Sequence, residues 1–134
     1  MEQSAARILV ADGEAPIRMT LERLLQHRGY TVTVADRGEE ALPLLEQHTF
    51  DLLLLDLKLP GISGLEVAQH ARTLQPTVAI LLLTGHAALD DTSNMLQQGA
   101  FEYMIKTASP ADVLARVAAS LAERASTNAG GPLQ

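Results

Sequence analysis

Four consecutive leucines at residues 52–55 constrain the fold of this chain more than any other feature. A continuous apolar run of this length is typical of a strand buried on both faces, as in a parallel sheet covered by helices. Asp56 follows the run directly. Doubly wound α/β folds place their ligand sites at this carboxyl edge of the sheet. Asp56 is therefore a candidate for chemistry, not merely for solubility.

Apolar runs alternate with helical patterns along the whole chain. Strands are predicted at residues 7–11, 31–35, 51–55, 78–83 and 101–105. Helices are predicted from Pro16 to a stop at Gly29, at residues 39–48, 64–74 and 88–98, the last capped by Gly99, and after Ser109 and Pro110. Short loops and right-handed crossovers leave few topologies for such a (βα)5 chain. The best fit is a flavodoxin-like α/β fold, a three-layer sandwich whose parallel five-stranded sheet has the order 2-1-3-4-5.

Residues 1–124 contain this pattern and are expected to form one domain. Residues 125–134 show no periodicity and include Gly130-Gly131-Pro132, so we expect a disordered tail or the start of a linker. The formal charge of −6 argues against non-specific nucleic-acid binding by this segment. The absence of cysteine excludes thiol chemistry, and no apolar stretch approaches the roughly 20 residues of a membrane span. We therefore expect a cytoplasmic protein with no membrane partner.

Segments with polar groups follow four of the predicted strands and meet at one edge of the sheet. They are Asp12, Gly13 and Glu14 after the first strand, Asp56 at the third, Thr84 and Gly85 at the fourth, and Lys106 after the fifth. A carboxylate can attack phosphorus to form an aspartyl phosphate, and catalysis of that step is mostly positioning and charge neutralisation. Mg²⁺ on hard oxygen ligands would offset the repulsion between the dianion and the carboxylate. The set therefore fits phosphoryl transfer to a carboxylate.

Four short motifs surround these residues in a fixed order. They are Ile8-Leu9-Val10-Ala11-Asp12, Asp56-Leu57-Lys58-Leu59-Pro60-Gly61-Ile62-Ser63-Gly64, Leu82-Leu83-Thr84-Gly85-His86-Ala87 and Gly99-Ala100-Phe101-Glu102-Tyr103-Met104-Ile105-Lys106. Together they resemble a response-regulator receiver domain of two-component (phosphorelay) signalling. The resemblance implies a switch that catalyses at most its own phosphorylation and dephosphorylation. It also implies a histidine kinase or phosphotransfer protein as phosphodonor, and a downstream protein or output domain.

The resemblance implies a role for each site residue. Asp56 becomes the phosphoacceptor, and Lys106 becomes the cation that binds the phosphoryl oxygen. Mg²⁺ would be held by Asp12, Asp56 and the backbone carbonyl of Lys58. The hydroxyl of Thr84 would move in response to phosphorylation. Partner binding would change on the face formed by helix 4, strand 5 and helix 5.

Tyr103 would be the aromatic switch on that face, although an aromatic half buried against the fourth helix is an equally open interpretation. Pro60 and Gly64 are interpreted as turn residues that shape the loop after Asp56. His86 lies two residues after Thr84, where a role in water access and a solvated loop position are both open.

Two positions depart from the family pattern. Receivers usually carry two adjacent acids after the first strand, the second binding Mg²⁺ directly, but here the second is Gly13, and Glu14 is a further candidate ligand. Weakened Mg²⁺ binding is therefore expected. Thr107 stands where the family has a proline with a cis bond. A cis bond before a non-proline residue costs about 3–4 kcal/mol, so a trans bond and a reshaped loop are expected.

Two other functions stay open. The departures allow a degenerate receiver that acts as a phosphate-independent protein-interaction module. A true enzyme or flavin carrier on the same fold is disfavoured, because the chain has no glycine-rich phosphate loop and few aromatic residues. A haloacid-dehalogenase-type phosphatase would need a second acid two residues after the nucleophile, where Lys58 stands.

Overall fold

The computed structural model describes residues 5–85, 102–106 and 109–130. Its elements are β1 (Arg7–Ala11), α1 (Ala15–His27), β2 (Thr31–Ala35), α2 (Gly38–Gln47), β3 (Leu52–Asp56), α3 (Gly64–Leu74), β4 (Ala79–Thr84), β5 (Glu102–Ile105) and α5 (Pro110–Gly130). The predicted helix at residues 88–98 lies outside the described residues, as do His86, Gly99, Phe101 and Thr107. The other predicted elements are present, with bounds that shift by a residue or two except at the end of α5.

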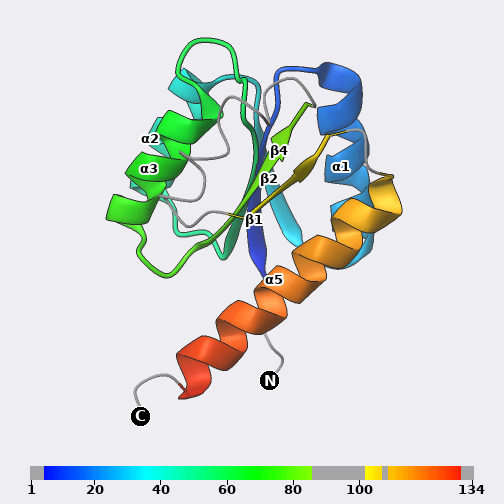
Figure 1. Cartoon of the computed structure of the whole chain (residues 1–134), viewed down its shortest axis with the longest axis vertical. Helices are drawn as coiled ribbons and strands as arrows, with labels where there is room; N and C mark the ends of the chain where they lie inside the picture. The colour runs from blue at the N-terminus through cyan, green and yellow to red at the C-terminus, as the bar shows by residue number, and fades with distance from the viewer. Residues whose placement is uncertain (1–4, 86–101, 107–108, 131–134) are drawn as a thin grey trace.

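The five strands form one parallel sheet in the order β2-β1-β3-β4-β5, which confirms the predicted topology. The leucine run is its central strand, with Leu54 opposite Val10 of β1 on one side and Leu81 of β4 on the other. Figure 1 shows α2 and α3 on one face of the sheet and α1 and α5 on the other. Each leucine of the run is 0% exposed, as expected for a strand covered on both faces.

Alternate leucines of β3 enter two separate cores. Leu53 and Leu55 pack in the core beneath α2 and α3, whereas Leu52 and Leu54 pack in the core beneath α1 and α5. This division follows from the two-residue period of a strand, which sends successive side chains to opposite faces. A strand that is apolar at every position therefore satisfies both layers at once.

Helix α5 begins as predicted but runs further. The backbone N–H of Asp112 donates to Ser109 Oγ over 3.2 Å, which confirms Ser109 as the N-cap. The helix continues to Gly130, further than the sequence pattern indicates. The expectation that residues 125–134 begin a linker stays a prediction. Residues 125–129 contain no proline or glycine, so no strong helix breaker interrupts the helix before Gly130. The domain boundary itself stays a prediction.

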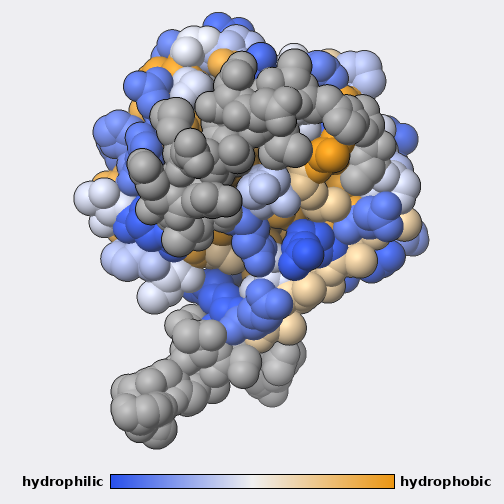
Figure 2. Space-filling view, in the orientation of Figure 1, coloured by the Kyte–Doolittle hydropathy of each residue, from blue (hydrophilic) through white to orange (hydrophobic). Residues whose placement is uncertain are grey.

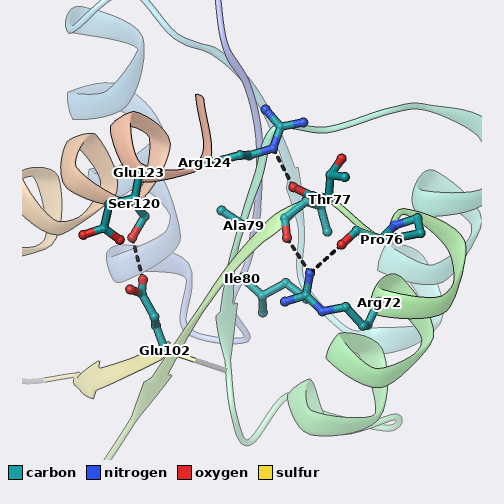
Figure 3. A pocket seen from close by; sticks show the side chains of 10 residues that line it. Arg72, Pro76, Thr77, Ala79, Ile80, Glu102, Ser120, Glu123 and Arg124 are labelled. Carbon is teal, nitrogen blue, oxygen red and sulfur yellow. Dashed lines mark hydrogen bonds between the residues drawn. The ribbon is translucent and has the colours of Figure 1, made fainter. Parts of the chain in front are cut away.

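The amino edge of the sheet is held by two arginines from helices on opposite faces (Figure 3). Arg72 of α3 donates to the carbonyls of Pro76 and Val78 over 3.1 and 2.8 Å. Arg124 of α5 donates to the carbonyl of Thr77 over 2.6 Å, and to Asp51 Oδ1 over 3.0 Å. Three successive carbonyls of the α3–β4 turn are thus bound by guanidinium groups. The bonds of Arg124 fix α5 against the edge of the sheet opposite to Asp56, and those of Arg72 fix α3 to the same turn.

Hydrophilic residues dominate the described surface seen in Figure 2, with apolar residues in smaller areas among them. Among the described residues, the exposed large apolar side chains are Met19 of α1, Leu74 of α3 and Tyr103 of β5. No helix in the described part of the chain is long and apolar enough to cross a membrane.

Candidate functional site

Asp56 is the last residue of β3 and lies at the carboxyl edge of the sheet, opposite Leu83 of β4. The residue is 6% exposed, and its Oδ1 accepts from the backbone N–H of Lys58 over 3.1 Å. Gly64 packs directly against the Asp56 carbonyl oxygen, where any Cβ would clash with backbone atoms. The loop after Asp56 therefore returns tightly over the end of β3, and only glycine fits at position 64.

The same loop is secured where α3 begins. Ser63 Oγ accepts from the backbone N–H of Glu66 over 3.2 Å, and the Glu66 side chain accepts from the Ser63 N–H over 3.4 Å. This reciprocal pair is a capping box. Because both ends of the loop are fixed, the backbone around Asp56 and Lys58 is well defined.

Lys106 brings the acidic side chains together. Its Nζ lies 2.9 Å from Asp56 Oδ2, 3.1 Å from Asp12 Oδ1 and 3.6 Å from Glu14 Oε2. The backbone N–H of Lys106 donates to the Thr84 carbonyl over 2.7 Å, which anchors the lysine beside β4. The strand ends that the sequence predicts to converge therefore do converge, around one ammonium group.

Asp12 is the most buried member of the group, at 1% exposed. Burial raises the pKa of its carboxyl, and the charge of Asp56 adds to that rise. The Glu14 amide, which donates to Oδ1 over 2.8 Å, and Lys106 lower the pKa without cancelling the rise. Within the described residues Asp12 Oδ2 is buried and has no hydrogen-bond partner. Such an oxygen is a position that a bound cation or donor would satisfy.

The charge of Lys106 is maintained by its acidic neighbours. Burial alone lowers the pKa of its ammonium group, but the hydrogen bonds and charges of Asp56 and Asp12 outweigh burial and raise it. The lysine is therefore a permanent cation at neutral pH. It partly neutralises a site that would otherwise hold its carboxylates in mutual repulsion.

The carboxylates fit a hard divalent cation in part. Asp12 and Asp56 offer oxygen ligands of the kind that Mg²⁺ prefers, and Asp12 Oδ2 is unpartnered among the described residues. Within the same residues, however, no three acidic, histidine or cysteine side chains stand close enough to hold a metal together. This agrees with the glycine at position 13, where a second adjacent acid is missing.

Pro60 closes the space beside Gly13, a contact that sequence reasoning missed. A Cβ at residue 13 would lie 2.8 Å from Pro60 Cδ and 3.0 Å from Pro60 Cγ. The two residues are 47 positions apart in the sequence, and no local pattern reveals their contact. The Pro60 ring therefore occupies part of the space that a side chain at residue 13 would need.

Thr84 and Tyr103 occupy different environments. Thr84 ends β4 at 1% exposed, and its hydroxyl donates to the Gly85 carbonyl over 3.2 Å. Tyr103 lies in β5 and is 40% exposed. An apolar hollow of about 290 Å³ lies beside Lys106, between α1 and the start of α5. It is lined by Pro16, Ile17, Thr20, Leu21, Leu83, Pro110 and Val113 as well as Lys106.

Comparisons with known proteins agree on one family. A family model described as the response regulator receiver domain matches residues 8–118. The DNA-binding transcriptional regulator NtrC of Salmonella typhimurium is 37% identical over 118 residues, which cover 88% of this chain and 24% of NtrC. The chain thus spans about a quarter of the length of the first curated relatives that it matches.

Solved structures give the same result. A CheY-like receiver domain protein from Methanospirillum hungatei superposes with a TM-score of 0.84 at 32% identity, covering 92% of this chain and 98% of that one. The response regulator TrrA of Thermotoga maritima, crystallised in complex with Mg²⁺ and BeF, superposes with a TM-score of 0.76 at 37% identity. That match covers 86% of this chain and 98% of TrrA.

Proposed function

Because the chain belongs to the family of response regulator receiver domains, we propose that it is a signalling switch whose Asp56 accepts a phosphoryl group. The observation that carries the proposal is the position of Asp56 at the end of the central strand, with Lys106 Nζ 2.9 Å from its Oδ2. Asp12 Oδ1 forms an ion pair with the same ammonium group, and the buried Asp12 Oδ2 has no hydrogen-bond partner among the described residues. These are a nucleophile, a cation and a cation-binding carboxylate in one buried group.

The proposed reaction is a displacement at phosphorus. An Asp56 carboxylate oxygen forms the new bond to phosphorus, while the bond to the leaving group of the donor breaks and its electron pair departs with that group. Lys106 stabilises the negative charge on the phosphoryl oxygens. Receiver domains generally bind Mg²⁺ at this site, where it supplies further charge neutralisation. Here we propose Asp12, Asp56 and the backbone carbonyl of Lys58 as ligands.

The signal would leave the site through Thr84 and Tyr103. The Thr84 hydroxyl, which donates to the Gly85 carbonyl, would exchange that bond for a phosphoryl oxygen. Tyr103, two residues before the end of β5 and exposed, would change its position in response. The proposed output surface is the face of helix 4, β5 and α5, of which β5 and α5 lie in the described residues.

The proposed phosphodonor is a cytoplasmic histidine kinase or phosphotransfer protein. The apolar hollow beside Lys106 offers such a protein a contact next to the acceptor. Thr20, exposed on α1 at the rim of the hollow, allows a test. Thr20→Lys should slow phosphorylation by a protein donor and leave phosphorylation by acetyl phosphate unchanged. If the protein donor phosphorylates Thr20→Lys as fast as the wild type, the hollow is not a contact site for the donor. Downstream, the fourfold longer relatives favour an output domain as the partner.

The central experiment is phosphorylation of the intact chain by acetyl phosphate with Mg²⁺, followed by mass spectrometry. The wild type should gain the mass of one phosphoryl group, and Asp56→Asn should not. Asp51→Asn is the matched control, because Asp51 precedes the same strand at its opposite end. A gain that survives Asp56→Asn, or no gain at any Mg²⁺ concentration, would refute the proposal.

A phosphate-independent interaction module is the second candidate, favoured by Gly13 and by the Pro60 ring that closes over it. Restoring an acid distinguishes the two functions. Gly13→Asp should be made together with Pro60→Ala, since the proline ring obstructs a Cβ at position 13. A cycling receiver should then bind Mg²⁺ more tightly and phosphorylate faster. An interaction module should show no gain in phosphorylation.

A further inference from the structure

Arg18 of α1 is a cation at the acidic edge of the sheet to which the proposed reaction gives no role. Arg18 is half-buried, and its Nη1 donates to the backbone carbonyl of Asp12 over 2.8 Å. The hydrogen bond from Arg37 is the main cause that lowers the pKa of Asp36, directly after β2, and the charge of Arg18 adds to this effect. The guanidinium group therefore lies near the ends of both β1 and β2.

The bond from Arg18 restrains the backbone where the chain leaves β1. The Asp12 carbonyl belongs to the peptide group that joins Asp12 to Gly13, and glycine has more conformational freedom than any other residue. On the β2 side this backbone is held by the Asp12 N–H, which donates to the Ala35 carbonyl over 3.1 Å. On the α1 side it is held by the guanidinium group of Arg18. Arg18 therefore limits the rotation that Gly13 would otherwise allow.

The side chain of Asp12 depends on this backbone position. Asp12 Oδ1 accepts from the Glu14 N–H over 2.8 Å and from Lys106 Nζ over 3.1 Å. The same ammonium group lies 2.9 Å from Asp56 Oδ2. A rotation of the peptide group after Asp12 would move Oδ1 relative to the ammonium, and so would change where Lys106 lies beside Asp56. A continuous series of contacts thus leads from Arg18 through Asp12 and Lys106 to Asp56.

We propose that Arg18 is a positioning residue for the phosphorylation of Asp56 and acts through the backbone carbonyl of Asp12. The inference rests on the proposed function, because it concerns the rate of that same reaction. Catalysis of phosphoryl transfer is mostly positioning and charge stabilisation, so a residue that fixes the partner of Lys106 affects the rate. Arg18 itself forms no bond to phosphorus and exchanges no proton.

The test compares phosphorylation rates of the whole chain with acetyl phosphate and Mg²⁺, followed by intact mass and expressed per folded molecule. Arg18→Met keeps an unbranched side chain but removes the charge and every donor. We expect its rate to fall by about tenfold to a hundredfold, because misplacement by about 1 Å can cost a factor of about a hundred. Arg18→Lys, which keeps the charge and a donor, should recover most of the rate. The matched control is Arg23→Met, the same change at an exposed position of α1.

A second measurement follows the backbone directly. Hydrogen exchange of the Glu14 amide, which donates to Asp12 Oδ1, should be faster in Arg18→Met than in Arg23→Met when measured by NMR. If the rate falls but this exchange is unchanged, the effect does not pass through Asp12 and the inference is wrong.

The outcomes separate the inference from the proposed function. If wild type is phosphorylated on Asp56 and Arg18→Met reacts as fast as Arg23→Met, the inference is wrong while the phosphoacceptor stands. If Arg18→Lys is as slow as Arg18→Met, a cationic donor at this position is not what the reaction needs, and the inference is again wrong. If wild type gains no phosphoryl group, the proposed function fails and the inference fails with it. Circular dichroism of each variant controls for folding.

Discussion

The contact between Gly13 and Pro60 gives a prediction that the structure makes quantitative. Gly13 does not have the positive φ that penalises side chains, so alanine is compatible with its backbone. Such a replacement in open space stabilises by about 0.4–1 kcal/mol, because it restricts the unfolded chain. Here the new methyl would lie 2.8 and 3.0 Å from two ring atoms of Pro60. Overpacking of this kind costs about 1–3 kcal/mol.

Gly13→Ala should therefore lower the free energy of unfolding by about 1 kcal/mol. In a Pro60→Ala background both clashing ring atoms are gone, and the same substitution should stabilise by about 0.4–1 kcal/mol. The coupling energy between the two sites is then about 1–3 kcal/mol, in the range measured for residues in contact. Gly85→Ala is the matched control, since none of the described residues has an atom within 4 Å of a Cβ at that position.

Urea unfolding followed by far-UV circular dichroism measures all five proteins, and the two-state assumption is tested by comparing the slopes with denaturant. The reasoning predicts opposite signs for Gly13→Ala in the two backgrounds. If Gly13→Ala is as stabilising as Gly85→Ala in the wild-type background, the ring does not obstruct position 13. The absence of an acid at residue 13 would then be unrelated to the position of the Pro60 ring.

Three further predictions concern other parts of the molecule. Asp12→Asn should raise the free energy of unfolding at pH 7, because burial raises the pKa of Asp12 above 3.8 and its ionisation in the folded state costs stability. That gain should vanish below about pH 3.8, where Asp12 is protonated in both states, and a gain independent of pH in urea unfolding contradicts the argument. Gly64→Ala should cost more than about 3 kcal/mol, since its Cβ meets backbone of Asp56 and Leu57, and an equally stable variant by the same assay refutes the clash. Arg124→Gln should cost about 1 kcal/mol and accelerate amide hydrogen exchange in the second half of α5, whereas unchanged exchange would show that other contacts fix the helix.

The sheet and the acidic edge were predictable because both follow from periodicity. The run at residues 52–55 is typical of a strand covered on both faces, and parallel order then brings Asp12, Asp56 and Lys106 to one edge. These inferences need no knowledge of any loop. The family prediction, which rests on the same residues, is confirmed over residues 8–118. The roles of individual residues stay predictions.

The features that sequence reasoning missed depend on loops and on propensity without burial. The closure of Pro60 over Gly13 is set by the path of the loop after Asp56, which is held by Gly64 and by the capping box. No apolar stripe marks residues 125–130, so the sequence pattern predicts no helix there. The helix nevertheless continues, because extending an existing helix avoids the cost of nucleation and no proline interrupts it. The pattern of apolar residues predicts the strands and helices that bury them, but not the path of a loop or the end of a helix.

Charge at the acidic edge is where stability and the proposed function oppose each other. Burial and the charge of Asp56 make ionised Asp12 unfavourable, and Lys106 offsets only part of this penalty. Replacing one of the carboxylates would stabilise the fold. Substitutions of this kind are commonly available in natural proteins, and their usual cost is a loss of function. An under-neutralised group of this kind is stabilised by whatever cation binds to the folded state, because binding to the native state alone adds to the free energy of unfolding. The same carboxylates that weaken the fold are therefore the ones that make it responsive to a cation.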